Sequence, residues 1–248
     1  GGGGGGGGES ESSFESLRAR VDDLQRQGHL VGVVVIDGSG VEEFGNLSEG
    51  PAWSTAKVPL ASAVLKGEQF GDSAALIDAA IRTSDNSAAD AMWNLLGTPD
   101  EAALKVEQVI HDSGDDRTHV LAEQVRPEFS AVGQTTWSLV DQAKFLKGWR
   151  CKPQARPVLA AMRDVASEHR FGLGHIDRAA IKGGWGPNLE GQYLVRQMAI
   201  VPQGSSDIVV TMAAQAGDGS YETGVTLLDE LSKGIQESSW KPVPGCNE

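Results

Sequence analysis

The sequence predicts an α+β fold, with a mostly antiparallel sheet of about five strands, terminal helices packed on that sheet and an inserted all-helical lobe. Three observations lead to this prediction. Both ends of the chain have helical periodicity, strand-like segments come in two groups, and a long helical block separates the groups. We expect residues 11–53 and 170–242 to form the sheet lobe and residues 54–169 the helical lobe. Residues 1–10 are expected to be a tag, a linker or disordered.

The first strand group follows an amphipathic helix. Phe14, Leu17, Val21 and Leu24 recur at helical spacing. The segment 30–45, LVGVVVIDGSGVEEFG, then predicts two strands joined by a glycine-rich turn.

The remaining elements follow from apolar periodicity. Helical patterns occupy residues 57–66, 74–96, 99–112 and 136–148. Strand patterns return at residues 179–185, 191–202 and 206–216, and the last helical pattern covers 221–236.

Composition excludes several classes of partner. The 248 residues are 40% hydrophobic and 22% charged, as in ordinary globular proteins. A net charge of −13 argues against binding nucleic acid or an anionic membrane. No apolar run is long enough for a membrane span. The oligomeric state stays open.

Two cysteines, Cys151 and Cys246, lie in proline-containing loop segments. They could form a disulfide that ties the C-terminal tail to the body and implies an oxidising compartment, or they could be unrelated free thiols.

The stretch PAWSTAKVPLASAVL places Ser54 three residues before Lys57, where a helical pattern begins. A serine here can cap the helix. It can also be a nucleophile with its base one turn away. Ser238 and Lys241 repeat the spacing near the C-terminus without a further motif around them.

Two other short motifs are ordinary when taken alone. Ser84, Asp85 and Asn86 lie in a break between two helical patterns, where they could form an N-cap. Lys182, followed by two glycines, lies where a strand runs into a turn.

Together, S-x-x-K, S-D-N and K-x-G in this order resemble the signature of penicillin-binding proteins and class A β-lactamases. The resemblance is closest in residues 53–65, 81–90 and 134–146. It implies the fold predicted above and a secreted or cell-envelope bacterial serine hydrolase without cofactor or metal. The implied substrate is a β-lactam or a peptidoglycan-like D-amino-acid peptide.

The resemblance also implies roles. Ser54 would be the nucleophile, and Lys57, three residues along the same helical face, its base. Burial and the charge of Lys182 would lower the pKa of Lys57. Ser84 would pass a proton to the leaving nitrogen, and Asn86 would hold Lys57 and a substrate amide.

The same resemblance assigns the substrate-binding strand. Gly184 completes the K-x-G motif, and the backbone N–H groups of Ser54 and Trp185 would bind the oxyanion. Gly183 replaces the usual hydroxyl that helps to bind a substrate carboxylate. Arg196 could bind that carboxylate instead, or be an exposed strand cation.

Further departures concern the cleft and turnover. Ser54 and Ser84 are closer in sequence than in typical class A enzymes, which predicts a wide, open site. Glu128, two residues after Arg126, resembles the glutamate of the deacylation loop, but the loop is short; Glu123 is a weaker candidate. Both could be solvated loop carboxylates. We therefore expect weak β-lactam turnover.

A noncatalytic protein of the same fold, binding a cell-wall fragment or a protein partner, is the alternative function. The segment HDSGDDRTH, residues 111–119, lacks metal-site spacing and is expected to be a polar loop. His169 and His175 receive no chemical role.

Overall fold

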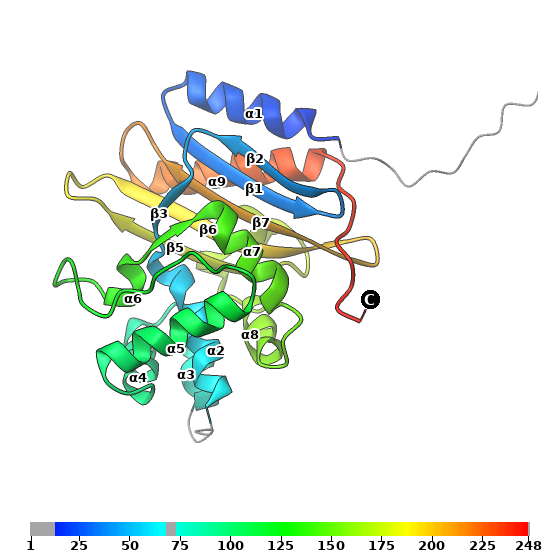
Figure 1. Ribbon diagram of the computed structural model, residues 1–248. Coiled ribbons are helices and arrows are strands. Elements are labelled where there is room, and N and C mark those ends of the chain that lie inside the picture. Colours follow the sequence, from blue (N-terminus) through cyan, green and yellow to red (C-terminus); the bar gives the residue numbers. More distant parts are fainter. Residues whose placement is uncertain (1–12, 68–72, 248) are drawn as a thin grey trace, which may run out of the picture.

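A computed structural model describes residues 13–67 and 73–247 of the protein. The tag or linker expected at residues 1–10 lies outside this range. The core element is a five-stranded antiparallel sheet (Figure 1). Its strands, in spatial order, are β2 (Gly40–Gly45), β1 (Leu30–Asp37), β7 (Ser206–Gln215), β6 (Tyr193–Gln203) and β5 (Ala180–Pro187). The predicted α+β fold and five-stranded sheet are confirmed.

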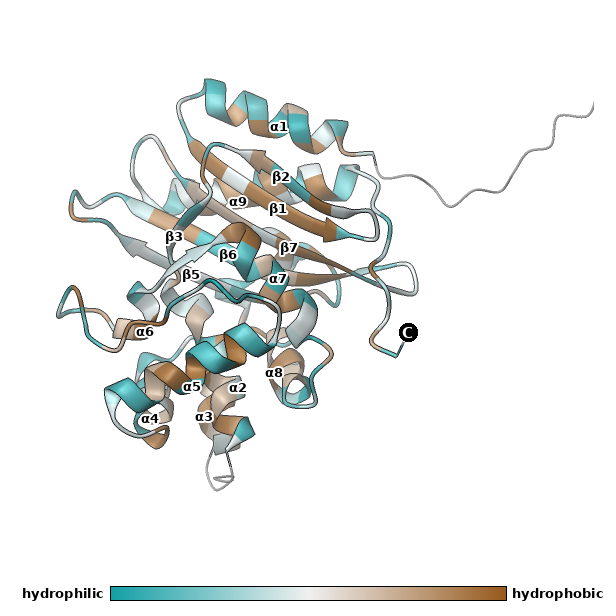
Figure 2. Ribbon diagram, viewed as in Figure 1, coloured by the Kyte–Doolittle hydropathy of each residue, from teal (hydrophilic) through white to brown (hydrophobic). Residues whose placement is uncertain are grey.

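One face of the sheet is covered by the terminal helices, α1 (Glu15–Arg26) and α9 (Tyr221–Glu237) (Figure 1). Alternating apolar residues of β1, β6 and β7 pack against them, including Val33, Val195 and Val210. Because β-strand side chains alternate between faces, the neighbouring residues pack into a second core on the other face. Figure 2 accordingly shows long hydrophobic stretches along β1 and β7.

The helical lobe covers the second face (Figure 1). Its helices are α2 (Lys57–Lys66), α3 (Ser73–Arg82), α4 (Asn86–Leu95), α5 (Pro99–Asp112), α6 (Ala131–Gln134), α7 (Leu139–Trp149) and α8 (Ala155–Met162). Short 3₁₀ turns are η1 (Trp53–Ala56), η2 (Ser167–His169) and η3 (Gly172–His175).

The start of the predicted helix 136–148 was wrong. Residues Thr136–Ser138 form strand β4, which pairs with β3 (Glu49–Pro51) in a separate two-stranded sheet. Helix α7 begins only after Ser138, whose hydroxyl accepts the backbone N–H of Asp141 at 3.0 Å. This N-cap ends the extended segment.

The segment 111–119, expected to be a polar loop, contains the last two residues of α5 and continues without helix or strand from Ser113. Asp115 is buried, and its carboxylate accepts the indole N–H of Trp137 at 2.9 Å and the hydroxyl of Thr118 at 2.5 Å. Its acid group anchors the segment to the lobe core, because a buried carboxylate requires such donors.

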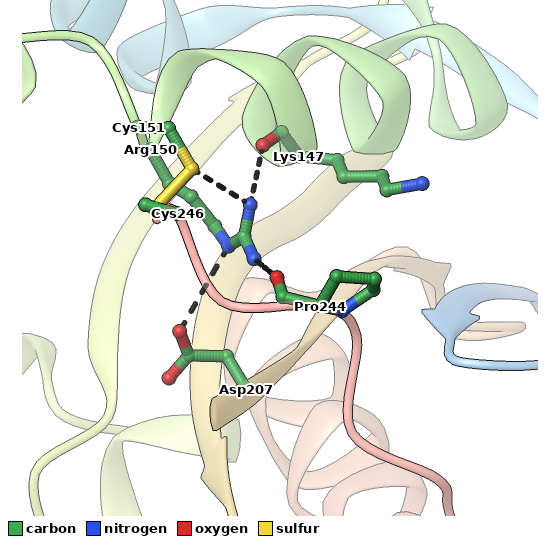
Figure 3. The surroundings of a disulfide bond; sticks show 6 residues. All are labelled: Lys147, Arg150, Cys151, Asp207, Pro244 and Cys246. Carbon is green, nitrogen blue, oxygen red and sulfur yellow. Dashed lines mark hydrogen bonds and ion pairs between the residues drawn. A yellow bond between two sulfur atoms is a disulfide. The ribbon is translucent and has the colours of Figure 1, made fainter. Parts of the chain in front are cut away.

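Cys151 and Cys246 form a disulfide that ties the C-terminal tail to the end of α7 (Figure 3). Arg150 lies beside it and donates to the carbonyls of Lys147 and Pro244. Its guanidinium also lies 3.8 Å from the carboxylate of Asp207. Of the two possibilities for the cysteines, the structure contains the bonded pair.

Within residues 13–67 and 73–247, none of the helices has both the length and the apolar character required to cross a membrane. In the same ranges, no three His, Cys, Asp or Glu side chains come together as candidate metal ligands.

Candidate active site

Ser54 lies in η1, the turn that leads into α2. The residue before α2 is Ala56, and no side-chain cap is formed there by the described residues. Trp53, directly before the serine, has a positive φ of 49°, a conformation that is strained for a bulky residue. Ser54 is half-buried, and its hydroxyl contacts Lys57 rather than capping a helix.

Lys57 is the centre of the site. Its Nζ donates to Ser54 Oγ at 3.0 Å, to Ser84 Oγ at 3.0 Å and to the Ser84 carbonyl at 2.7 Å. A fourth acceptor, Asn86 Oδ1, lies at 2.7 Å, so the three hydrogens of the ammonium are shared among four oxygens. The three-residue spacing places the serine and lysine in contact, and the second motif supplies the other acceptors.

The segment carrying Ser84 is shaped for these contacts. Ser84 has a φ of 57°, and both of its oxygens therefore face Lys57. Asp85 then caps α4 by accepting the backbone N–H of Ala88 at 3.0 Å. The motif thus provides an N-cap and two contacts to the lysine at once.

Lys182 approaches from β5. Its Nζ donates to Ser84 Oγ at 3.1 Å and to the Gly183 carbonyl at 2.9 Å. Ser84 therefore bridges the two lysines. Neither ammonium forms an ion pair with a carboxylate in the described part of the chain.

The pKa of Lys57 is lowered to about 8, because burial disfavours the charged ammonium. The negative charges of Asp85 and Asp90 raise this pKa, but their effect is smaller than that of burial. Burial also holds the pKa of Lys182 well below its usual value, and the charge of Lys57 adds to the effect. At mildly alkaline pH, Lys57 thus has a large neutral fraction and can accept a proton.

Strand β5 passes directly over the nucleophile turn. A Cβ on Gly184 would lie 2.8 Å from the backbone nitrogen of Ser54 and 3.0 Å from that of Thr55. Only glycine permits this approach. Trp185 follows at once and carries the second predicted oxyanion N–H; that role stays a prediction. Its ring packs on His169 and Tyr221.

Gly183 points to the other face of β5. A Cβ there would meet the ring of Phe171 at 3.1 Å, which is tighter than an ordinary contact. A threonine at this position would press on a buried aromatic ring, so the missing hydroxyl cannot be restored without moving Phe171.

Arg196 is not a cleft residue, and neither of its predicted roles fits the structure. Its side chain is 1% exposed. Its Nη1 donates to the carbonyls of Gly50, Pro51 and Trp137 at 2.9–3.0 Å, and its Nη2 to Gln142 Oε1 at 3.1 Å. The guanidinium joins β6 to the β3–β4 pair, because it satisfies buried carbonyls there.

This network continues to the nucleophile turn. Gln142, fully buried on α7, donates from Nε2 to Thr55 Oγ1 at 3.0 Å, and Thr55 Oγ1 donates to the Ala52 carbonyl at 2.5 Å. Sequence reasoning missed Gln142. Its position among the buried apolar residues of α7 was the signal that could have indicated a buried hydrogen-bonding role.

Glu128 is exposed and lies 3.5 Å from Arg126 Nε. No hydrogen bond or ion pair in the described ranges joins it to Ser54 or Lys57. Glu123 borders a cavity between α4 and the 122–132 segment, together with Trp93 and Ser130.

Searches for similar proteins agree with this architecture. No protein-family model matches the sequence, and no curated protein matches it. Solved structures do: an engineered variant of the class A β-lactamase of the last common ancestor of Gram-negative bacteria has a TM-score of 0.70 and 18% identity. That match covers 90% of this chain and 97% of the other. This chain has the class A β-lactamase fold.

Two natural structures of the same β-lactamase fold are similarly close. A β-lactamase from Xanthomonas campestris pv. campestris is 21% identical with a TM-score of 0.70, over 90% of this chain and 97% of that one. A class A β-lactamase from Mycobacterium abscessus is 17% identical with a TM-score of 0.68, over 89% and 98% of the two chains. At such identities the likeness concerns the fold, and the chemistry rests on the residues of the site.

Proposed function

We propose that the protein is a serine hydrolase that forms an acyl-enzyme at Ser54. The observation that carries the proposal is Lys57, whose Nζ lies 3.0 Å from both Ser54 Oγ and Ser84 Oγ and whose pKa is lowered to about 8. A lysine with a lowered pKa in contact with a serine hydroxyl is the arrangement that activates such a nucleophile.

The acylation step follows from these contacts. Neutral Lys57 takes the hydroxyl proton as Ser54 Oγ attacks the substrate carbonyl carbon. The resulting oxyanion accepts hydrogen bonds from the backbone N–H groups of Ser54 and Trp185. As the carbon–nitrogen or carbon–oxygen bond breaks, the proton passes from Lys57 through Ser84 Oγ to the leaving group. Lys182 holds Ser84 Oγ in place at 3.1 Å.

The test is covalent labelling. We expect an uncharged fluorophosphonate probe to add one phosphonyl group per molecule by intact-mass measurement, at a site that peptide mapping assigns to Ser54. Ser54→Ala should remain unlabelled. Adducts that persist in Ser54→Ala, or that map to Ser238, would overturn the assignment.

For turnover, we propose that β-lactam hydrolysis is weak. Deacylation needs a water beside the ester and a base for it, and the exposed Glu128 is paired with Arg126 instead. Glu128→Gln should therefore change hydrolysis of a chromogenic cephalosporin less than about threefold, far below the ~10²-fold typical of a removed general base. Rapid hydrolysis that collapses in this variant would contradict the proposal.

The proposed substrate class is a β-lactam or a D-amino-acid peptide-like amide or ester. A secreted or cell-envelope location is proposed as well, and the disulfide between Cys151 and Cys246 supports it, because such bonds persist in oxidising compartments.

A noncatalytic binder is the second candidate, and the position of Glu128 is the observation that favours it. A binder would leave Ser54 unlabelled by the fluorophosphonate while its fold stays intact.

A further inference from the structure

The disulfide between Cys151 and Cys246 lies at the surface, and its two sulfurs have different surroundings (Figure 3). Both cysteines are exposed. Arg150 Nη1 donates to Cys151 Sγ at 3.1 Å. Within residues 13–67 and 73–247, no group donates a hydrogen bond to Cys246 Sγ. One sulfur therefore has a cation against it, and the other does not.

The guanidinium of Arg150 is held firmly in this position. Its side chain is only 6% exposed, and it donates to the carbonyls of Lys147 and Pro244. The carboxylate of Asp207 lies 3.8 Å from Nε, whereas Nη1 is the atom that contacts the sulfur. The ammonium of Lys147 points away from the disulfide (Figure 3). Arg150 thus places a fixed positive charge against Cys151.

Such a charge makes the two directions of thiol–disulfide exchange unequal. A cation beside a cysteine favours its thiolate, and a sulfur whose thiol has a lower pKa is the better leaving group. Attack on Cys246 Sγ places the developing negative charge on Cys151 Sγ, 3.1 Å from Arg150 Nη1. Attack on Cys151 Sγ places that charge on Cys246, which has no donor among the described residues. Attack on Cys246 is therefore favoured.

We propose that this disulfide is a modification site for small thiols, in which Cys246 is attacked and Cys151 is the leaving group. The thiolate of a molecule such as glutathione attacks Cys246 Sγ and forms a mixed disulfide with it. The bond between the two cysteines breaks, and its electron pair stays on Cys151 Sγ as a thiolate. A second glutathione thiolate then attacks the glutathione sulfur of the mixed disulfide, which releases glutathione disulfide and the Cys246 thiolate.

The surrounding structure has contacts that outlast this cleavage. The backbone N–H of Val243 donates to the Asp207 carbonyl at 2.8 Å, and Trp240 is packed in the core with 4% exposure. The tail is therefore held up to Val243 without the disulfide. Arg150 stays beside Cys151, because the two are neighbours in sequence and the guanidinium is bound to a carbonyl of α7.

The position of the first glutathione tests the proposal. The protein is incubated briefly with reduced glutathione and then acidified to stop exchange, and its peptic peptides are identified by mass spectrometry. A hydrogen bond to a charged group corresponds to a factor of roughly 10 or more, part of which is expressed in the transition state. We therefore expect about fivefold to tenfold more glutathione on Cys246 than on Cys151.

Variants test whether Arg150 causes this preference. Arg150→Gln should bring the ratio of the two adducts to within about twofold of one, because the cation beside Cys151 is gone. Arg26→Gln, on the exposed side of α1, removes an arginine charge elsewhere and should leave the ratio unchanged. Near-ultraviolet circular dichroism shows whether each variant is folded.

A second measurement leaves Arg150 in place. Cys246→Ser leaves Cys151 as a free thiol, Cys151→Ser leaves Cys246 free, and the pH dependence of alkylation by iodoacetamide gives the pKa of each. We expect the pKa of Cys151 to lie below the ordinary ~8.5 and below that of Cys246. Burial raises the pKa of the neighbouring Asp207, and the charges of Arg150 and Arg163 lower it in part. These groups are the same in both variants.

Glutathione mainly on Cys151, equal amounts on the two cysteines, or an unchanged ratio in folded Arg150→Gln would overturn the inference. So would a pKa of Cys151 at or above that of Cys246, a result that needs no change at Arg150. None of these outcomes depends on the acylation of Ser54.

Discussion

At the scale of single residues, Lys57 is a cation placed where its charge is poorly solvated. It is 5% exposed, and all four of its acceptors are neutral oxygens. Water would stabilise the ammonium form better than these partners do, so the pKa falls. The contact with Ser54 followed from the sequence spacing, but the size of the pKa shift depends on burial by both lobes.

Gly184 gives the first prediction at this scale. Gly184→Ala would place a Cβ 2.8 Å from the backbone nitrogen of Ser54, and the turn must move away. Because displacing a reacting group by about 1 Å can reduce rates ~10²-fold, we expect labelling of Ser54 to slow by about that factor.

The matched control is Gly67→Ala, at the end of α2. Among the described residues, its Cβ would meet only the Val64 carbonyl, at an ordinary 3.4 Å, and its φ of −76° suits alanine. Equal labelling rates in Gly184→Ala and the unmodified protein would show that the close approach is unimportant.

Residue roles were less predictable where they depend on neighbours from distant segments. Arg196 carries a charge on a strand near the site, and its sequence context suited a ligand-binding role. Its guanidinium instead donates to the carbonyls of Gly50, Pro51 and Trp137. These residues belong to three-residue strands, which are too short to show a recurring pattern of apolar residues. Asp115 was missed for the same reason, since its donor Trp137 belongs to that small sheet.

At the scale of elements, the two-stranded sheet of β3 and β4 links the lobes under the nucleophile turn. Arg196, on β6, donates hydrogen bonds to carbonyls of both short strands and to the side chain of Gln142. Gln142 in turn donates to the hydroxyl of Thr55 in the nucleophile turn. The sequence predicted most helices and all five main strands, because apolar residues recur at a helix or strand spacing over the whole length of these elements. Three-residue strands lack such a signal.

Arg196→Ala tests this structural role. The substitution leaves three carbonyls and the Gln142 amide oxygen without their buried donor, which should lower the free energy of unfolding by about 3 kcal/mol or more. Urea denaturation measures the change. Arg156→Ala, exposed on α8, should stay within about 0.5 kcal/mol of the unmodified protein. Unchanged stability with a raised KM would instead return Arg196 to ligand binding.

At the scale of the whole molecule, the order of elements predicted the architecture: helix, two strands, helical lobe, three strands and helix. The disulfide adds a long-range link that the sequence left open. Whether two loop cysteines meet depends on where the C-terminal tail runs after α9, which local patterns do not encode.

Reduction of this disulfide should lower stability. Cys151 and Cys246 are 95 residues apart, and closing a loop of that order restricts the unfolded chain by up to ~4.7 kcal/mol. We expect dithiothreitol to lower the unfolding free energy by about 2–4 kcal/mol. A variant with both cysteines replaced by alanine should not respond to the reductant. If the two proteins respond alike, the bond does not form in solution.

The central claim, that Lys57 in its neutral form activates Ser54, is tested most directly by the pH dependence of labelling. The rate of reaction with the uncharged fluorophosphonate should rise about tenfold per pH unit below the pKa, bend near pH 8 and level off above it, because only unprotonated Lys57 accepts the serine proton. In Lys57→Ala the rate should be ~10²-fold lower and the bend near pH 8 should vanish. A flat profile between pH 6 and 10 in the unmodified protein, or the same bend retained in Lys57→Ala, would contradict the claim.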